Sequence, residues 1–383
     1  MPDRRVAIVG AALSDCGRVD DKTAFELNFQ ATSRALADAG IDRSEVDGFM
    51  ALTGALPPVE LAEYLGLKPD WVDSTGHGGS IWECMVEHAA AAIAQGLVEV
   101  VVLTYGSTQR ADLKKNLRLA NLSFGTRGPV QFAAPFGHPV GSHYAMVARR
   151  HMHEFGTTIE QLAEVAVSTR HNAGLNPDAF YRDPITIDDV VDAPLVWDPL
   201  TKLHCSIRTD GGGAIVLTHE DRARDCARAP IWVLGTGEAA SHTTMSEWDD
   251  FTESPCVRSG ALAFARAGLT PDDIDVAQLY DAFTPMVLLT LEGLGFCPKG
   301  EGGAFVEDGR LRVGGAFPTN TDGGGLSACQ PGMRGIFLLV EAVQQLRGAC
   351  GARQVPDARV ACVNGTSGWF TAAGTVLLGN ERP

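Results

Sequence analysis

The order of hydrophobic and polar positions repeats once along the chain. Each copy begins with an apolar strand pattern, continues with a helix that ends at Ala-Gly, and passes through a polar capping stretch into a second strand. A glycine-rich turn then opens an amphipathic helix, and another apolar strand follows. The matched segments are 4–13 and 229–240, 35–52 and 263–283, 76–96 and 323–348, and 98–106 and 358–368.

This repeat predicts two similar α/β halves, each with a mixed sheet. The first half takes residues 1–106 and 196–225, and the second takes residues 226–383. Residues 107–195 have no counterpart, and we expect them to form a loop or lid insertion over a site. The alternative is two generic α/β domains whose turns are alike by coincidence.

Charge and cysteine content narrow the function classes. The formal net charge of −16 disfavours nucleic acid as a partner, because the field of the protein repels phosphates. The nine cysteines include no C-x-x-C pair and no zinc-ligand spacing, which indicates reduced thiols in the cytoplasm and no metal site. No apolar run is long enough for a membrane span, and the short run at 6–13 predicts a first strand rather than a signal peptide.

Candidate chemistry lies where predicted strands end. The glycine-rich turns at 74–80 and 319–332 each open a helix, so their free N–H groups can bind an oxyanion or phosphate; the glycines also suit plain tight turns. A third strand ends at Tyr280 and Asp281, just before a helix start at Thr284-Pro285. A tyrosine there can donate to an oxyanion, or it can simply pack with its hydroxyl satisfied. Helix capping is the commoner role for an aspartate in this place.

Two segments resemble the thiolase superfamily, and most of all its sterol-carrier-type thiolases, also called lipid-transfer proteins. They are "LHCSIRTDGGGAIVLT" (203–218) and "YDAFTPMVLLTLEGLGFCPKGEGGAFVEDG" (280–309), and the likeness extends over nearly the whole chain. The resemblance implies two pseudo-twofold-related βαβαβ halves with five-stranded mixed sheets in an α-β-α-β-α layering. It also implies a homodimer that forms through the strand at 98–106.

The residues that thiolases use for acyl transfer are largely replaced. Their nucleophilic cysteine falls on Gly79, the asparagine of their Asn-Glu-x-Phe motif on Tyr280, and the histidine of their Gly-His-Pro motif on Gln330. Their second cysteine falls near Cys362. Without a thiol no acyl-enzyme forms, and a glutamine cannot act as a base near pH 7.

A Gly-His-Pro string does occur, at 137–139, but it lies in the insertion and not at the second glycine-rich turn. His138 is therefore not expected to be the thiolase histidine, although its loop can overhang an acyl pocket. The basic fragment 109–115 is a candidate for holding phosphates of coenzyme A, or else a solvated surface. The candidates for substrate or oxyanion contacts are His77, Gly79, His138, Cys329 and Gly365.

The resemblance implies a cysteine-independent aldolase. It would cleave a β-hydroxyacyl-CoA with a steroid or bile-acid side chain, using Tyr280, Gln330 and Asp281 as catalytic residues. The products would be a ketone and a short acyl-CoA such as propionyl-CoA. Related aldolases tend to carry a second tyrosine where this chain has Gln330, which leaves the substrate open.

The expected ligand is a coenzyme A thioester, with no covalently bound cofactor. Aldolases of this kind pair with a zinc-ribbon/OB-fold protein, which implies a heterotetramer. Two alternatives stay open. The first is an acyltransferase that uses Cys84 or Cys329 as its nucleophile, and the second is a non-catalytic subunit that binds acyl-CoA or lipid.

Overall fold

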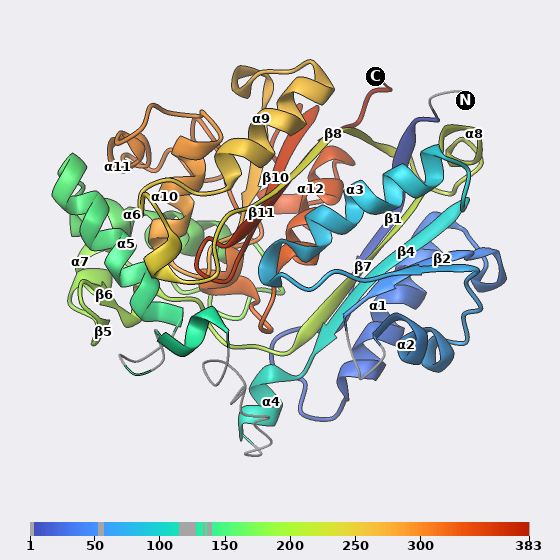
Figure 1. Ribbon diagram of the computed structural model, residues 1–383, viewed down its shortest axis with the longest axis horizontal. Helices are drawn as coiled ribbons and strands as arrows, with labels where there is room; N and C mark the ends of the chain where they lie inside the picture. Colours follow the sequence, from blue (N-terminus) through green and yellow to red (C-terminus); the bar gives the residue numbers. More distant parts are fainter. Residues whose placement is uncertain (1–3, 53–56, 115–127, 133–134, 136–139, 383) are drawn as a thin grey trace.

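The computed structural model describes residues 4–52, 57–114, 128–132, 135 and 140–382. A nine-stranded mixed sheet runs through the molecule in the order β3-β2-β4-β7-β1-β8-β11-β10-β9 (Figure 1). Its strands are β1 (Val6–Leu13), β2 (Gly48–Ala51), β3 (Trp71–Asp73), β4 (Val100–Ser107), β7 (Gly211–His219), β8 (Ile231–Ala240), β9 (Val276–Leu279), β10 (Val360–Ser367) and β11 (Ala372–Gly379). A separate hairpin consists of β5 (Leu195–Trp197) and β6 (Leu200–Thr201).

The sheet has two halves with the same strand order, which confirms the predicted mixed α/β halves. The halves are not two separate five-stranded sheets, however, because antiparallel pairing of β1 with β8 at Ala7–Trp232 joins them into one. In the second half, a single parallel bridge between Ala277 and Thr319 takes the place of a fifth strand. This pairing joins strands of different halves, so it depends on how the halves meet and not on a pattern within either strand.

Two helices form a central layer between the half-sheets. They are α3 (Ile81–Ala94) and α12 (Gly335–Leu346), which contact each other and strands of both halves. Nearly every residue of α12 is buried, including the polar Glu341 and Gln345, because the helix is covered on all sides in the central layer. The outer layers are α1 (Ala24–Ala39), on β1, β4 and β7, and α9 (Cys256–Ala267), on β8 and β11. The result is the predicted α-β-α-β-α layering.

The segment between β4 and β7 adds helices at one end of the molecule. Figure 1 shows α5, α6 and α7 on the side of α10 and α11, at the opposite end from β2 and α2. Helix α6 braces the second glycine-rich turn, because Arg170 donates to Oγ of Ser327 (2.7 Å) and Asn172 donates to the carbonyl oxygen of Thr319 (2.9 Å). The remaining helices are α2 (Pro57–Leu65), α4 (Gln109–Lys114), α5 (Val140–Phe155), α6 (Ile159–Gly174), α7 (Ile187–Val191), α8 (Glu220–Ala223), α10 (Thr284–Gly293) and α11 (Gly302–Phe305).

Strand β4, which was expected to mediate a homodimer, lies inside the sheet. It pairs with β2 along one edge and with β7 along the other, and all of its residues except Ser107 are buried. That expectation is therefore wrong, because β4 offers no edge or face to a second copy. Within the described part of the chain, no helix combines the length and apolar character needed to cross a bilayer.

Candidate active site

Tyr280 directly follows β9, just before α10 begins. Its backbone N–H donates to the carbonyl oxygen of Asn364 on β10 (3.0 Å), so the sheet fixes its position. The buried hydroxyl oxygen accepts two hydrogen bonds, from Nε2 of Gln330 and from the backbone N–H of Arg334 (3.2 Å each). Since both acceptor positions are used, the phenol's own proton is left to donate to a third group. Burial raises the pKa of Tyr280, which keeps that proton in place near neutral pH.

Gly79 lies against the ring of Tyr280. A Cβ atom at Gly79 would stand 2.5 Å from Cε2 and 2.6 Å from Cζ of that ring, and 2.4 Å from the carbonyl oxygen of Thr366. Real Cβ atoms do not approach neighbours so closely, and here the neighbours are a buried ring and backbone. A cysteine therefore does not fit at this position while Tyr280 is present. The ring of Tyr280 and the backbone at Thr366 together leave no room for a side chain at Gly79.

Gln330 stands beside Tyr280 and is also buried. Its backbone N–H donates to Oγ1 of Thr209 (2.9 Å), and its Nε2 donates to Tyr280 and to the carbonyl oxygen of Gly332 (3.4 Å). Its Oε1 has no hydrogen-bond partner among the described residues. The amide thus orients the phenol and leaves one free acceptor beside it.

Asp281 holds the loop that carries Gln330. Its carboxylate accepts two backbone N–H bonds from the turn at 324–328 (2.8 and 3.2 Å) and lies 3.5 Å from Nε of Arg334. Arg334 is fully buried and also pairs with Asp322 (2.5 Å). Asp281 does not cap α10, whose N-cap residue is Phe283. Its contacts shape the turn, and a direct catalytic role for it stays a prediction.

The two thiols considered as substitute nucleophiles are both buried. Burial raises the pKa of Cys84, so its thiol stays protonated and unreactive at neutral pH. For Cys329, burial also acts to raise the pKa, but hydrogen bonds with Cys16 and Thr209 outweigh it and lower the pKa. The sulfur of Cys329 lies 3.1 Å from Oγ1 of Thr209. Among the described residues, no hydrogen bond joins either sulfur to Tyr280.

Two of the other predicted contacts, His77 and Gly365, lie near the same centre. His77 precedes the first glycine-rich turn, with Nδ1 3.3 Å from Oγ of Ser80, and burial lowers its pKa. Gly365 lies on β10, where a Cβ atom would stand 2.2 Å from Oε2 of Glu83. His138 lies outside the described residues. Substrate contact by these three residues stays a prediction.

Comparison with known proteins places this geometry in a family. Residues 237–380 match the family described as "Thiolase C-terminal domain-like". A steroid side-chain-cleaving aldolase of Thermomonospora curvata is 35% identical over 98% of this chain and 98% of its own. The chain belongs to the thiolase superfamily. An acetyl-CoA acetyltransferase of Methanothermobacter thermautotrophicus is 33% identical over 95% of this chain and 97% of its own. The solved structure of the "Ltp2-ChsH2(DUF35) aldolase" matches with a TM-score of 0.89 at 32% identity, covering 99% of this chain and 98% of that one.

Within the thiolase superfamily, sequence identity alone does not separate the two activities, because relatives named aldolase and acetyltransferase match at 35% and 33%. The site separates them. Acyl transfer of the thiolase type needs a nucleophile, and this member has a glycine whose side-chain space is taken by Tyr280. The predicted likeness to the steroid side-chain aldolases is confirmed.

Three buried polar residues of this thiolase-like site were not among the predicted ones: Thr209, Arg334 and Glu83. Glu83 carried a signal, because it is a charged residue inside the apolar stretch "IWECMV" (81–86). No sequence pattern pointed to Thr209 or Arg334 as site residues. Each becomes part of the site only when loops distant in the chain meet, and a sequence pattern does not contain that information.

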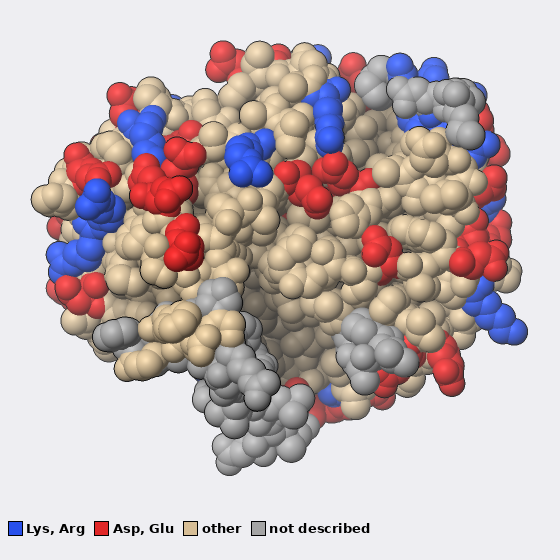
Figure 2. Space-filling model, in the orientation of Figure 1, with Lys and Arg blue, Asp and Glu red and all other residues tan. Residues whose placement is uncertain are grey.

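In the described part of the basic fragment 109–115, both cations face carboxylates. Arg110 pairs with Asp20 (3.0 Å) and with the buried Asp210 (3.4 Å), and Nζ of Lys114 lies 3.6 Å from Asp20. Lys115 lies outside the described residues. Figure 2 shows acidic and basic side chains interspersed over one face, which is hollowed near its centre among mostly uncharged atoms.

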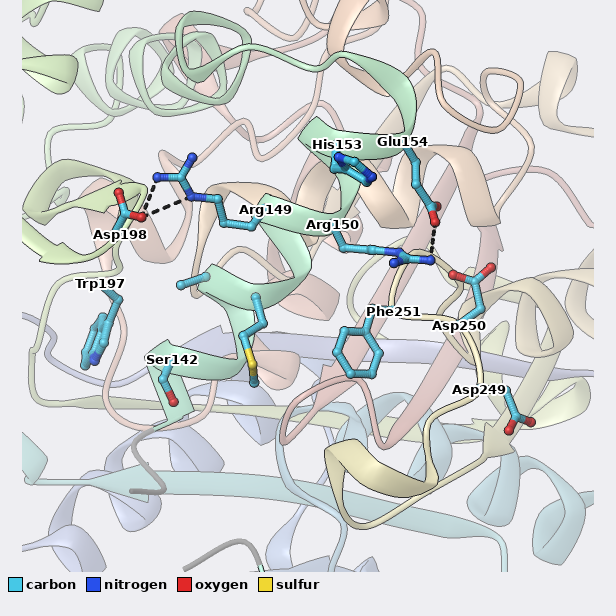
Figure 3. A pocket seen from close by; sticks show the side chains of 12 residues that line it. Ser142, Arg149, Arg150, His153, Glu154, Trp197, Asp198, Asp249, Asp250 and Phe251 are labelled. Atoms are coloured by element: carbon cyan, nitrogen blue, oxygen red, sulfur yellow. Dashed lines mark hydrogen bonds and ion pairs between the residues drawn. The ribbon is translucent and has the colours of Figure 1, made fainter. Parts of the chain in front are cut away.

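A cavity of about 1000 Å³ lies along α5. Figure 3 shows Arg149 and Arg150 extending from this helix in opposite directions, where Arg149 binds Asp198 (3.1 Å) and Arg150 binds Glu154 (2.5 Å). Its lining residues include the uncharged Ser142, Ala145, Met146, Trp197 and Phe251.

Aromatic rings connect this cavity to the segment between β9 and α10 that carries Tyr280. The ring of Trp197 contacts Phe283 edge-on, with 6.2 Å between ring centroids. Phe283 in turn stacks on Tyr144 of α5 (4.5 Å) and precedes α10, three residues after Tyr280. The contacts connect the cavity wall to the segment that carries the phenol.

Proposed function

We propose that this protein is a cysteine-independent aldolase that cleaves a β-hydroxyacyl-CoA by a retro-aldol reaction. The observation that carries the proposal is the close approach of Gly79 and Tyr280, which excludes a thiol and supplies a phenol proton. A retro-aldol cleavage needs an oxyanion donor and proton transfer, but no covalent intermediate. The full-length likeness to an aldolase supports the same reaction.

The reaction moves one proton and breaks one carbon–carbon bond. The substrate hydroxyl loses its proton, its carbon becomes a ketone, and the electron pair of the Cα–Cβ bond passes to the thioester as an enolate. The enolate then takes a proton at Cα, which gives the shorter acyl-CoA. Tyr280 donates its proton in a hydrogen bond to the thioester oxygen as charge develops there. Gln330 and Arg334 hold the phenol in that orientation, because both donate to its oxygen.

The substrate we propose is a coenzyme A thioester of a steroid or bile-acid side chain, and the short product is propionyl-CoA. The cavity along α5 supports a ligand with an apolar part, because Trp197 and Phe251 line it. Arg149 and Arg150 would bind phosphate oxygens only in exchange for their present partners Asp198 and Glu154, in a lining that also contains Asp249 and Asp250. No covalently bound cofactor is required by this chemistry.

We also propose a cytoplasmic assembly with two kinds of contact. The name of the matched aldolase structure includes a DUF35 component, which supports a second polypeptide of the zinc-ribbon/OB-fold kind in a heterotetramer. A homodimer is expected at β3, because β3 is at one edge of the described sheet and Val72 is 40% exposed there.

The test is an assay with a β-hydroxyacyl-CoA that carries a tertiary hydroxyl, with and without a DUF35-type partner. We expect equal amounts of ketone and shorter acyl-CoA, and no loss of rate after iodoacetamide treatment. Acetyl transfer that iodoacetamide abolishes would instead establish the acyltransferase alternative. Binding without turnover in both conditions would establish the non-catalytic alternative.

A further inference from the structure

Glu83 is a buried carboxyl group that the proposed reaction does not yet use. It lies on α3, one helical turn after Gly79, and is 1% exposed. Neither carboxyl oxygen has a hydrogen-bond partner from another described residue. An unpartnered carboxylate in such a place is strongly unfavourable, so the group requires an explanation.

The space for this carboxyl group is made by glycines from three elements. A Cβ atom would stand 2.6 Å from Oε2 of Glu83 at Gly335 on α12, and 2.2 Å from it at Gly365 on β10. At Gly374 on β11, a Cβ atom would stand 2.8 Å from Cβ of Glu83. Any larger residue at the three positions would displace the side chain, so the fold has a compartment shaped for it.

This compartment adjoins Tyr280. Arg334, whose backbone N–H donates to the phenol oxygen, immediately precedes Gly335, which lies against the carboxyl group. Gly79, which lies against the phenol ring, precedes α3 by two residues, and both its carbonyl oxygen and the carboxyl group of Glu83 lie against Gly335. Charge on Glu83 raises the pKa of Tyr280, although burial is the larger cause. The two groups therefore sense each other's charge.

The titratable groups around Glu83 come from every neighbouring element. Cys84 lies beside it on α3, and on β8 Glu238 faces Cys84. Arg334 at the N-cap of α12 directs its guanidinium to Asp322 and Asp281. Other ionisable side chains on adjoining elements are Tyr105 on β4, His219 on β7, Cys362 on β10, Glu341 on α12 and, after β9, Tyr280.

None of these groups is a hydrogen-bonded cationic partner for Glu83. Burial raises the pKa of Glu83 to about 8, so it is a neutral carboxylic acid at neutral pH. Neutral, it adds no charge to the site. Ionised, it places a negative charge in the compartment that adjoins Tyr280.

We propose that Glu83 is a positioning residue of the aldolase site, whose neutral acid form permits negative charge to build beside Tyr280 and whose carboxylate form opposes it. The inference rests on the proposed function. It predicts that the cleavage rate falls as the carboxyl group ionises, by about tenfold for each pH unit above that ionisation.

The first experiment needs no activity. A carboxyl group whose pKa rises from 4.5 to about 8 on folding stabilises the folded state relative to the unfolded one only at low pH. Stability is thus lost as pH rises from about 4.5 through about 8. We expect Tm to fall over this window in the wild type and to fall much less in Glu83→Gln or Glu83→Met. Parallel curves in all three proteins would overturn the proposal.

The second experiment is the pH profile of kcat between pH 6.5 and 9.5. The wild type should lose rate above about pH 8, whereas Glu83→Gln should show no such limb. Glu87→Gln is the matched control, because Glu87 lies one turn further along α3 and pairs with Arg266 (2.6 Å), and it should keep the limb. A folded Glu83→Gln protein with the wild-type profile, or with no activity at any pH, would overturn the proposal. No cleavage by the wild type would refute the proposed function instead, and the Tm curves would still report on Glu83.

Discussion

At the scale of single residues, the site depends on which atoms around Tyr280 act as donors. Two N–H groups already donate to the phenol oxygen, and these bonds polarise the O–H group toward the substrate. Because the raised pKa keeps the phenol protonated in the neutral range, Tyr280 is available there as a donor and not as a base. The geometry therefore favours oxyanion stabilisation over proton abstraction as the role of Tyr280.

The variant Tyr280→Phe tests this role. We expect kcat for ketone release to fall by at least about 100-fold, the effect of losing one oxyanion or acid–base group. Two buried donors lose their acceptor, which costs about 1–3 kcal/mol of stability, so Tm is measured alongside. A folded variant with a rate within about threefold of wild type would remove Tyr280 from the mechanism.

The contact between Gly79 and Tyr280 is tested by Gly79→Ala. The added methyl group meets backbone and a buried ring at 2.4 to 2.6 Å, so we expect about 1–3 kcal/mol of destabilisation and a large loss of activity. Gly76→Ala is the matched control, because nothing lies within 4 Å of a Cβ atom at Gly76 in the same turn. Equal stability and rate in the two variants would contradict the proposed fit.

At the scale of elements, the insertion supports the site from outside the repeated halves. Helix α6 holds the turn at 319–332 through Arg170 and Asn172, and α5 stacks Tyr144 on Phe283. The order of strands and helices was predictable, because alternation and helical periodicity are local properties of a sequence. The bracing of the turn was not, because it depends on contacts between segments more than 100 residues apart.

Helix α5 carries the next prediction. If Arg149 and Arg150 bind phosphates of coenzyme A, replacing each with alanine should raise KM for the acyl-CoA by roughly 10-fold or more, the scale of one charge-assisted hydrogen bond. Arg224→Ala, at an exposed arginine after α8, should leave KM unchanged. The measurement is KM and kcat for each variant. An unchanged KM in both α5 variants would place the phosphates elsewhere.

At the scale of the whole molecule, the departures of the structure from the sequence-based expectations have a common cause. The resemblance placed the positions of the thiolase cysteine and histidine at Gly79 and Gln330, because a motif comparison needs only matched positions, and these placements stay predictions. The capping role expected of Asp281 and the interface expected of β4 were both wrong, because each depends on neighbours that only the folded sheet and turn supply. The compartment around Glu83 also depends on such neighbours, because its glycines come from three separate elements.

The free edge of the sheet leads to a prediction about assembly. Strand β3 has only three residues, and an edge strand with an exposed apolar side chain is suited to pairing with a second copy. We expect a particle of twice the 40.6 kDa chain mass in light scattering. Val72→Lys brings like charges together across a twofold edge and should shift the mass to that of one chain. Leu97→Lys changes an apolar residue that is 66% exposed outside β3, and it should leave the dimer intact. A wild-type monomer, or a Val72→Lys dimer, would show that β3 does not join two copies.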